Sequence, residues 1–434
     1  MSVLAPGRVA YVNARLLDPA SGLDHKGSLL TDGEVIIDLG PHLFADGMPS
    51  DTEVIDCQGA CLAPGLVDMR VQLREPGEEH KETLLTAGLA AVAGGVTTVV
   101  CLPNTTPVID DVAAVEFVAR RARKNGLAKV YPYAAATKGL AGLELAEIGM
   151  LAEAGALAFT DGTKAIKNAL VMRRALSYAA TFGVLIIQHP EEPSLAEGAM
   201  NEGEMATRLG LPGIPPAAEA IMLERDMRLV ALTGARYHAA HISTAAAVEI
   251  IRKAKAQGLP VTCDTAPPYF ALNELAVGEY RTFAKLSPPL RAEEDRQSIV
   301  AAIKDGTIDA IASDHAPQDQ DSKRLPFAQA ACGGVGLETL LAVTLELYHN
   351  GYLSLLDVIS RVSWEPARLL GLPAGQLKVD MAADLVLFDP DRPWRVTPED
   401  FQSKSKNSPF DGRPVQGKVL RTVIDGRPVF IADA

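Results

Sequence analysis

Cysteine is scarce in this sequence of 434 residues, and its five copies are an odd number. So few cysteines in so long a chain do not make a disulfide framework, and we expect them to be small buried hydrophobic residues. Cys57 and Cys61 are four residues apart, but no second pair of Cys or His lies nearby to complete a zinc site. The other three, Cys101, Cys263 and Cys332, lie in apolar segments.

Positive charge is also in short supply, because 41 Lys and Arg residues face 54 Asp and Glu residues and leave a net charge of −13. A chain of this sign repels phosphate backbones and anionic lipids, so we expect no nucleic acid and no membrane among its partners. Long apolar runs are missing too. The run from Val96 to Leu102 falls far short of the ~20 residues that a spanning helix needs, and the N-terminus lacks the pattern of a signal peptide. These absences predict a soluble cytoplasmic protein.

What the sequence does contain is typical of a globular protein, since 48% of its residues are hydrophobic. Both ends of the chain alternate apolar and polar residues between turn signals, which is typical of strands and hairpins. The first end covers residues 1–63, and the second covers residues 372–434, where Asp425-Gly426 indicates a tight hairpin turn. We therefore expect the two ends to pair into one small β domain.

Residues 64–371 have a different texture, in which short apolar runs alternate with longer amphipathic stretches. Three of these stretches end at glycines suited to the left-handed position after a helix, namely Gly126, Gly258 and Gly306. Eight strand and helix units in succession predict a (β/α)8 barrel. The eight runs are GLVDMRVQL, VTTVVCLPN, KVYPYAAAT, ALAFTD, VLIIQH, RYHAAHIS, PVTCDTAP and DAIASDHAP.

Polar residues stand where these runs end, and in such a barrel that rim holds the chemistry. Asp161, His189, His241 and Asp314 each end a different run, and two imidazoles with two carboxylates suit zinc or a similar divalent ion. A single histidine of this kind is more often a packed core residue, but four such groups together favour a present or ancestral metal site. His238 is three residues from His241, so it points elsewhere, and we assign it no function.

Several longer motifs resemble the dihydroorotases of the amidohydrolase superfamily, specifically the longer class. The resemblance implies a (β/α)8 barrel with a β-sandwich side domain, and a site for dihydroorotate and carbamoyl aspartate in pyrimidine biosynthesis. It also implies that Arg74 and Asn104 bind the substrate carboxylate and that Asp314 shuttles a proton. An equally plausible role for Arg74 is an ion pair with Glu75, Glu78 or Glu79. The motifs are DMRVQLREPGEEHKETLLTAGLAAVAGGVTTVVCLPNTTP, HAAHISTAAAVEIIR, SPPLR, IASDHAP, PFAQAACGGVGLET and SKSKNSPFDG.

The chain departs from this family at the metal site. Active members carry a His-x-His pair on the first barrel strand, where this chain has Arg70 and Gln72. A guanidinium has no lone pair to offer a metal, and a carboxamide is a weak zinc ligand. Other expected polar groups are missing at Ala266-Pro267-Pro268-Tyr269, Ser287 and Gln318. We hypothesise that Arg70 supplies the missing positive charge to Asp161 and Asp314, and that Gln72 donates a hydrogen bond to the same cluster.

Three functions follow from these observations. The favoured one is an inactive homologue without a cofactor, part of an oligomer, and a structural partner of aspartate carbamoyltransferase, with which the resemblance implies assembly. The alternative is an active cyclic amidohydrolase that uses zinc at a displaced single site, with His189, His241 and Asp161 as ligands and Asp314 as acid and base. The third is a module that binds dihydroorotate or carbamoyl aspartate through Arg74 and Asn104.

Overall fold

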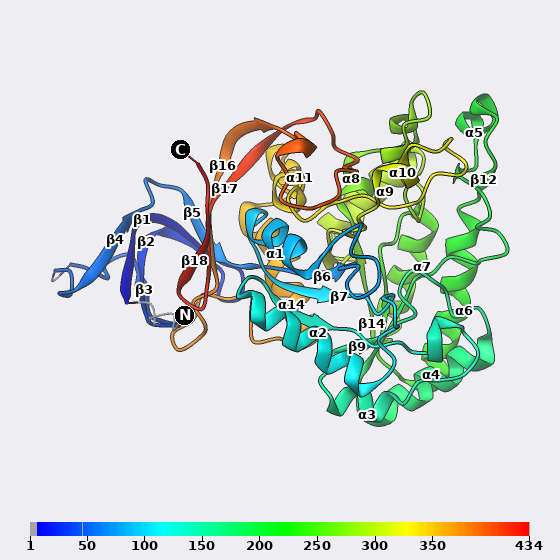
Figure 1. The fold of residues 1–434 in the computed structure, drawn as a ribbon, viewed down its shortest axis with the longest axis horizontal. Coiled ribbons are helices and arrows are strands. Elements are labelled where there is room, and N and C mark those ends of the chain that lie inside the picture. The colour runs from blue at the N-terminus through cyan, green and yellow to red at the C-terminus, as the bar shows by residue number, and fades with distance from the viewer. Residues whose placement is uncertain (1–6, 46, 434) are drawn as a thin grey trace.

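Both ends of the chain meet in one sheet of the computed structural model, which describes residues 7–45 and 47–433. The strand order is β18-β17-β16-β5-β1-β2-β3, and β4 also pairs with β1. The N-terminal and C-terminal parts are joined by the antiparallel pair β5 and β16 (Figure 1). The strands are β1 (Arg8–Asp18), β2 (Leu23–Asp32), β3 (Val35–Gly40), β4 (Thr52–Asp56), β5 (Cys61–Pro64), β16 (Leu385–Arg395), β17 (Pro414–Ile424) and β18 (Arg427–Ile431).

The turn between β17 and β18 lies where the sequence predicts it. Asp425 and Gly426 both have positive φ, 47° and 69°. Two such residues in succession give the backbone the twist of a tight hairpin, and glycine adopts this conformation without steric cost.

Eight parallel strands form a closed ring in the middle of the chain. They pair in two ladders, β6-β7-β8 and β9-β10-β13-β14-β15. Two parallel bridges, Ala134 with Phe159 and Val71 with His315, join these ladders at both ends. Each of the eight predicted runs contains one of these strands. They are β6 (Leu66–Val71), β7 (Val96–Cys101), β8 (Lys129–Pro132), β9 (Ala158–Phe159), β10 (Leu185–Gln188), β13 (Tyr237–Ala239), β14 (Val261–Thr265) and β15 (Ala310–Ile311).

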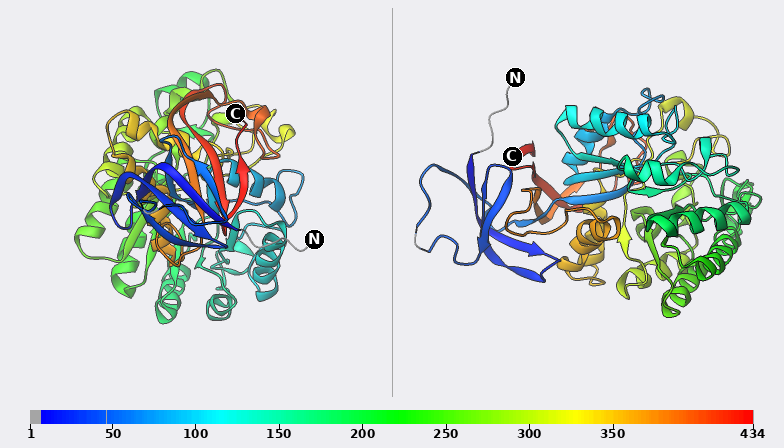
Figure 2. Two further views of the ribbon diagram at one scale, coloured as in Figure 1. Left: turned by 90° about the vertical axis from the view of Figure 1, so that its left-hand side faces the viewer. Right: turned by 90° about the horizontal axis from the view of Figure 1, so that it is seen from below.

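Helices surround the ring of strands (Figure 2). Those that follow the strands are α1 (Leu84–Ala93), α2 (Val112–Asn125), α3 (Ile148–Glu153), α4 (Ala169–Phe182), α6 (Ala217–Thr233), α7 (Ala245–Ala256), α9 (Glu293–Lys304), α11 (Leu340–Thr344), α12 (Glu346–His349), α13 (Leu355–Ile359) and α14 (Glu365–Leu370). Gly126, Gly258 and Gly306 have φ of 65°, 73° and 81°, so the predicted helix ends are confirmed.

Two long connections interrupt this regular alternation, after β10 and after β14. The first contains β11 (Met200–Asn201), α5 (Glu204–Leu209) and β12 (Gly213–Ile214), and the second contains the short helix α8 (Pro267–Ala271). A further short helix, α10 (Gln320–Lys323), follows β15. These segments leave the carboxyl ends of the strands and lie on the side of the ring away from the terminal sheet (Figure 1).

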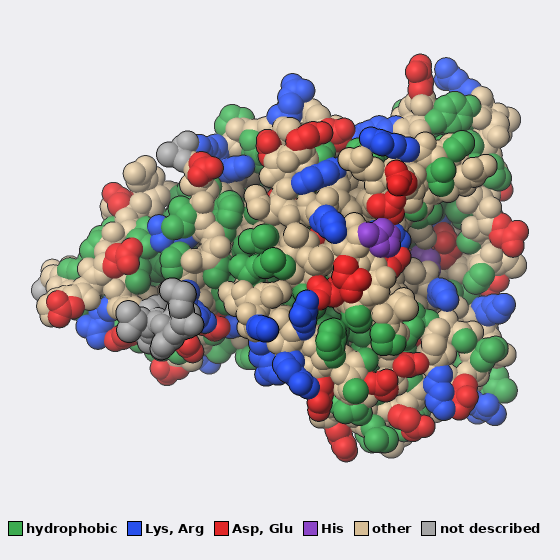
Figure 3. Space-filling view, in the orientation of Figure 1, with side chains coloured by type: hydrophobic (Ala, Val, Ile, Leu, Met, Phe, Trp, Pro, Cys, Tyr) green, Lys and Arg blue, Asp and Glu red, His purple; other side chains and the backbone are tan. Residues whose placement is uncertain are grey.

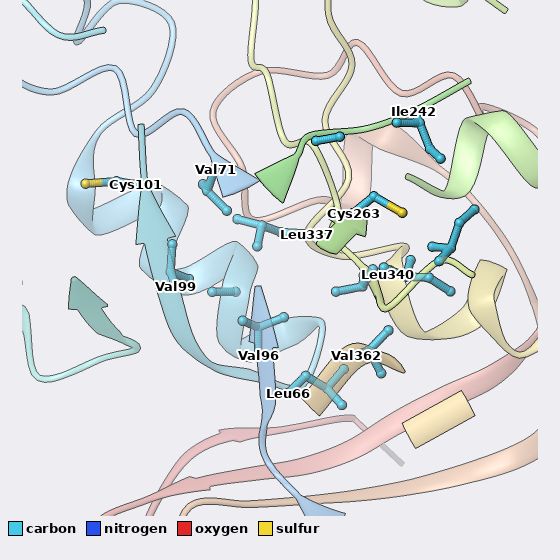
Figure 4. Close-up of a cluster of buried hydrophobic side chains, with 14 of the residues drawn as sticks. Leu66, Val71, Val96, Val99, Cys101, Ile242, Cys263, Leu337, Leu340 and Val362 are labelled. Carbon is cyan, nitrogen blue, oxygen red and sulfur yellow. The ribbon is translucent and has the colours of Figure 1, made fainter. Parts of the chain in front are cut away.

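The core between strands and helices is apolar and close-packed. Figure 4 shows Leu66 of β6 and Val96 of β7 beside Leu340 of α11 and Val362, and all four side chains are fully buried or nearly so. Cys57, Cys61, Cys101 and Cys263 are free and buried, as expected, whereas Cys332 is exposed, so the prediction for that residue is wrong. Across residues 7–45 and 47–433, the helices are all too short or too polar to span a membrane.

Candidate functional site

The polar residues predicted at the strand ends lie at the carboxyl edge of the ring. His189 directly follows β10, and His241 and Asp314 follow β13 and β15 by a few residues. The carboxyl ends of parallel strands meet at one edge, so side chains far apart in the sequence come together there. His241 and Asp314 also have positive φ, 40° and 49°, a strained conformation for non-glycine residues that is concentrated at functional sites.

Three of these side chains join two others in a continuous row that we name the mouth row, in the order Glu191, His189, His241, Asp314 and Arg70. The Nε2 atom of His189 lies 3.4 Å from Oε2 of Glu191. The Nδ1 atom of His189 lies 2.7 Å from Nε2 of His241, so one ring donates a hydrogen bond to the other. Nδ1 of His241 lies 3.3 Å from Oδ2 of Asp314.

Arg70 closes the row on the far side of Asp314. Its Nε donates to Oδ1 of Asp314 at 2.9 Å, and its Nη2 donates to the carbonyl oxygen of Gly162 at 3.3 Å. The Arg70 side chain is only 2% exposed. Among the described residues its Nη1 has no hydrogen-bond partner. The guanidinium is therefore a buried cation fixed beside a catalytic-type carboxylate.

Charge and burial shift the pKa values along the mouth row. Burial, helped by the Arg70 cation and opposed by the Asp314 carboxylate, lowers the pKa of His241 to about 4. Burial alone would raise the pKa of Asp314, but the adjacent His241 and Arg70 outweigh it and hold that pKa below its usual value. At neutral pH the row therefore holds a neutral His241 beside an ionised Asp314.

Asp161 does not join the mouth row, contrary to the expectation that Arg70 neutralises both aspartates. Its carboxylate accepts hydrogen bonds from the backbone N and the hydroxyl of Thr137, the first at 2.9 Å. Burial raises the pKa of Asp161. The direct partner of Arg70 is Asp314, and toward the Asp161 segment it reaches only the Gly162 carbonyl. The short β9 ends before Asp161 and turns its side chain toward Thr137, which the sequence pattern alone does not indicate.

Gln72 and Asn104 contact each other. Nδ2 of Asn104 donates to Oε1 of Gln72 at 3.0 Å. The structure does not show the predicted hydrogen bond from Gln72 to the carboxylate cluster. Among the described residues, the Gln72 side chain takes part in a hydrogen bond through its oxygen, as the acceptor from Asn104. The Asn104 amide, expected to hold a substrate carboxylate, is engaged by the residue that replaces a family histidine.

Arg74 is tied to the protein as well. Its Nη1 pairs with Oε2 of Glu78 at 2.8 Å, and its Nε donates to the carbonyl oxygen of Pro317 at 3.1 Å. Of the two roles weighed from the sequence, these contacts match the ion pair, and they name Glu78 as the partner. Burial lowers the pKa of Arg74.

His238 lies away from the mouth row, as its spacing from His241 predicts. Its side chain is fully buried, with Nδ1 2.8 Å from the hydroxyl of Thr262 and Nε2 3.3 Å from Oδ2 of Asp264. Glu191 is the member of the row that sequence reasoning missed. Glu191 is two residues after His189, and in extended chain this spacing places two side chains on the same side. This spacing was the feature of the sequence that could have indicated Glu191.

A second buried histidine network was also missed, next to Asp314. Nδ1 of His315 accepts from the backbone N of Gly336 at 3.2 Å, so the ring proton sits on Nε2, 3.5 Å from Oε2 of Glu82. Glu82 also accepts from the Ser403 hydroxyl. This network fastens the SKSKNSPFDG segment to the ring and supports the backbone that carries Asp314.

Comparison with known proteins adds to this geometry. Residues 59–247 match the family model described as dihydro-orotase-like. The chain is 49% identical to the dihydroorotase of Anaplasma phagocytophilum (strain HZ), with 98% of this chain and 96% of that protein covered. It is 46% identical to the dihydroorotase of Citrifermentans bemidjiense, with 96% and 98% covered.

The chain belongs to the dihydroorotase family. Solved structures agree in fold: L-hydantoinase from Arthrobacter aurescens aligns with a TM-score of 0.87 at 24% identity, covering 98% of this chain and 97% of that one. A D-hydantoinase aligns with a TM-score of 0.82 at 22% identity, covering 98% and 95%. The mixed α/β architecture is thus shared with this group of enzymes.

The mouth row does not fit the divalent metal that the dihydroorotase family implies. Two neutral imidazoles have two ring lone pairs between them, and one of these is used in the hydrogen bond between His189 and His241. The other two ring nitrogens face the carboxylates of Glu191 and Asp314. The position beside Asp314 is occupied by the Arg70 guanidinium, whose positive charge repels a metal cation. Within the described part of the chain, no group of three or more His, Cys, Asp and Glu side chains is arranged to hold a metal.

One small cavity lies directly beside Asp314. A cavity lined by Asp314, Pro267, Pro268 and Phe410 has a volume of 10 Å³, about the space of one water molecule. Pro267 and Pro268 belong to the stretch where the family resemblance leads one to expect a histidine. This cavity has room for a solvent molecule, whereas ligand sites occupy roughly 300 to 1,000 Å³.

Proposed function

We propose that this chain is a dihydroorotase-like protein of pyrimidine biosynthesis that has lost ring-opening activity and serves as a structural partner of aspartate carbamoyltransferase. The dihydroorotase-like part rests on relatives at 45–49% identity over nearly the whole chain. The loss of activity and the partner are our inference from the mouth row and from the family resemblance.

One observation carries the inactive assignment, namely the 2.9 Å ion pair between Arg70 and Asp314. Opening a cyclic amide at neutral pH needs a strong nucleophile and a polarised carbonyl group. A general base alone contributes only ~10² to 10⁴ in rate. Asp314 is a poor base in this setting, because Arg70 stabilises its ionised form and lowers its pKa.

Turnover and metal content test this proposal together. We expect purified protein to contain less than about a tenth of an equivalent of zinc and to convert no dihydroorotate above the buffer rate, with an active dihydroorotase as the positive control. Stoichiometric zinc together with turnover contradicts the proposal. That outcome favours the alternative, an active amidohydrolase with a displaced single site at His189, His241 and Asp161, and Asp314 as acid and base.

A role in binding dihydroorotate or carbamoyl aspartate has weaker support. It would need free polar groups at Arg74 and Asn104. Arg74 is paired with Glu78, and Asn104 with Gln72, so part of the donor capacity of both residues is already used by protein partners. We therefore favour the structural role.

We further propose that the ring of strands is a (β/α)8 barrel of residues 64–371, and that residues 1–63 and 372–434 together form the β-sandwich domain of this family. The closed cycle of eight parallel strands supports the barrel. Pairing of β5 with β16 supports one terminal domain. A cytoplasmic location and an oligomeric state complete the proposal, as expected for a partner of a metabolic enzyme.

A further inference from the structure

The outer edge of helix α2 carries an apolar groove that takes no part in the mouth row. It has a volume of 330 Å³ and is lined mainly by Pro76, Pro107, Ile109, Ala114, Phe117 and Val118. We name it the α2 groove. Its side chains come from α2 and from the loops that follow β6 and β7.

Helix α2 exposes a large apolar side chain at this groove. Phe117 is 44% exposed although Val115 and Val118, on either side, are buried. Asp111, which also lines the groove, is occupied as the helix cap and accepts from the backbone N of Ala114 at 2.8 Å. The lining is therefore apolar apart from the Asp111 carboxylate at the start of the helix.

Cations follow directly along the same helix. Phe117, Arg120 and Lys124 are spaced by three and four residues, so they share one face of α2. With Arg121 and Arg123, four of the five residues from 120 to 124 are basic, in a chain whose net charge is −13. Figure 3 shows Lys and Arg side chains gathered over this helix.

These cations are only partly neutralised. Arg121 pairs with Glu75 at 2.7 Å, and Arg120 lies 3.7 Å from Glu116, both of that pair being well exposed. Within residues 7–45 and 47–433, Arg123 and Lys124 have no carboxylate within ion-pair distance. The surface therefore offers an apolar pocket followed by Arg120, whose contact with Glu116 is long and exposed, and further along by Arg123 and Lys124, which have no carboxylate partner among the described residues.

We propose that the α2 groove binds an acidic protein segment that inserts an apolar side chain beside Phe117 and places carboxylates against Arg120 and Lys124. Charge complementarity selects the acidic partner, and the apolar lining selects a protein over a nucleic acid, whose backbone offers no side chain for the pocket. The surface is separate from the mouth row, so this proposal does not depend on whether the chain is catalytic.

The test uses a fluorescein-labelled probe peptide of twelve residues, with two Leu three positions apart followed by four Glu. We expect it to bind the whole protein at least tenfold more tightly than a version with Lys in place of Glu, or with Ser in place of Leu, as read by fluorescence anisotropy. Affinity should fall as salt rises, since the charges are exposed.

Two variants assign the binding to α2. Arg120→Gln/Lys124→Gln and Phe117→Ser should each weaken binding at least tenfold. The matched control is Arg173→Gln/Arg174→Gln on α4, a helix of the same length with two exposed arginines, and it should change affinity less than twofold. Circular dichroism verifies that each variant is folded.

The proposal is overturned by any of four results: no peptide binding, equal binding of the Lys peptide, equal loss in the α4 control, or α2-dependent binding of a single-stranded oligonucleotide in place of the peptide. A change of oligomeric mass in the α2 variant, without peptide binding by the original protein, also overturns it and assigns the face to self-association.

Discussion

Arg70 determines the electrostatics of the mouth row because it is the buried cation in direct contact with Asp314. It fills a position on β6 where the family resemblance places a metal-binding histidine, and its guanidinium takes over the positive charge next to the carboxylate. A buried ion pair adds little to stability as a whole, but removing one partner leaves the other uncompensated. Arg70 is thus expected to matter more for the fold than for any chemistry.

The first residue-scale prediction is that Arg70→Met lowers the free energy of unfolding by about 3 kcal/mol, because the buried carboxylate of Asp314 loses the cation that stabilises its ionised form. Denaturant titration measures it. The double variant Arg70→Met/Asp314→Asn should recover at least half of that loss, since the stranded charge is gone. If Arg70→Met alone is neutral, the ion pair does not hold the fold.

His241 gives a pH-dependent prediction. Its pKa is about 4 in the folded chain and 6.5 ordinarily, so the unfolded chain binds more protons between these values. Stability therefore rises with pH from about 4 to 6.5 and is lost on acidification, by up to about 3 kcal/mol from this group. Unfolding free energies at pH 4.5 and 6.5 measure the slope.

His241→Asn should flatten that slope, because the titrating ring is removed. The control is His80→Asn, whose side chain is 63% exposed and should leave the slope unchanged. A slope that survives in His241→Asn assigns the pH dependence to other groups.

At the scale of elements, the sequence pattern predicted the strands and helix ends that depend on interactions between residues close together in the chain. Apolar runs between amphipathic stretches marked all eight ring strands, and glycines such as Gly126 marked helix ends, because periodicity and left-handed φ are local properties. The hairpin at Asp425-Gly426 was predictable for the same reason.

The site was only partly predictable, because it depends on side-chain direction after a strand has ended. His189, His241 and Asp314 were expected at one edge and do meet. Asp161 turns to Thr137 instead, and Gln72 accepts from Asn104. Which partner a polar group takes depends on loop geometry and competing donors, and neither follows from residue spacing.

At the scale of the whole molecule, the described surface measures 17,090 Å², and the chain carries a net charge of −13 although helix α2 is basic. A stable protein complex covers roughly 800 Å² on each partner, so most of this surface remains available for assembly. Contacts made by charge alone weaken above physiological salt, where the screening length falls below about 8 Å. Salt therefore separates a specific complex from general attraction to an acidic protein.

The whole-molecule prediction is that the purified chain and aspartate carbamoyltransferase form a complex of defined mass that persists at about 0.5 M salt. A packed interface with an apolar centre resists screening, whereas exposed ion pairs do not. Analytical ultracentrifugation of each protein and of their mixture measures the mass. As the control, the transferase is replaced by an unrelated acidic protein of similar size and charge to the transferase, and this mixture should give no complex. If the two proteins sediment independently at both low and high salt, the proposal that aspartate carbamoyltransferase is the partner is wrong. The inactive assignment, which rests on Arg70, stands or falls separately with the turnover assay.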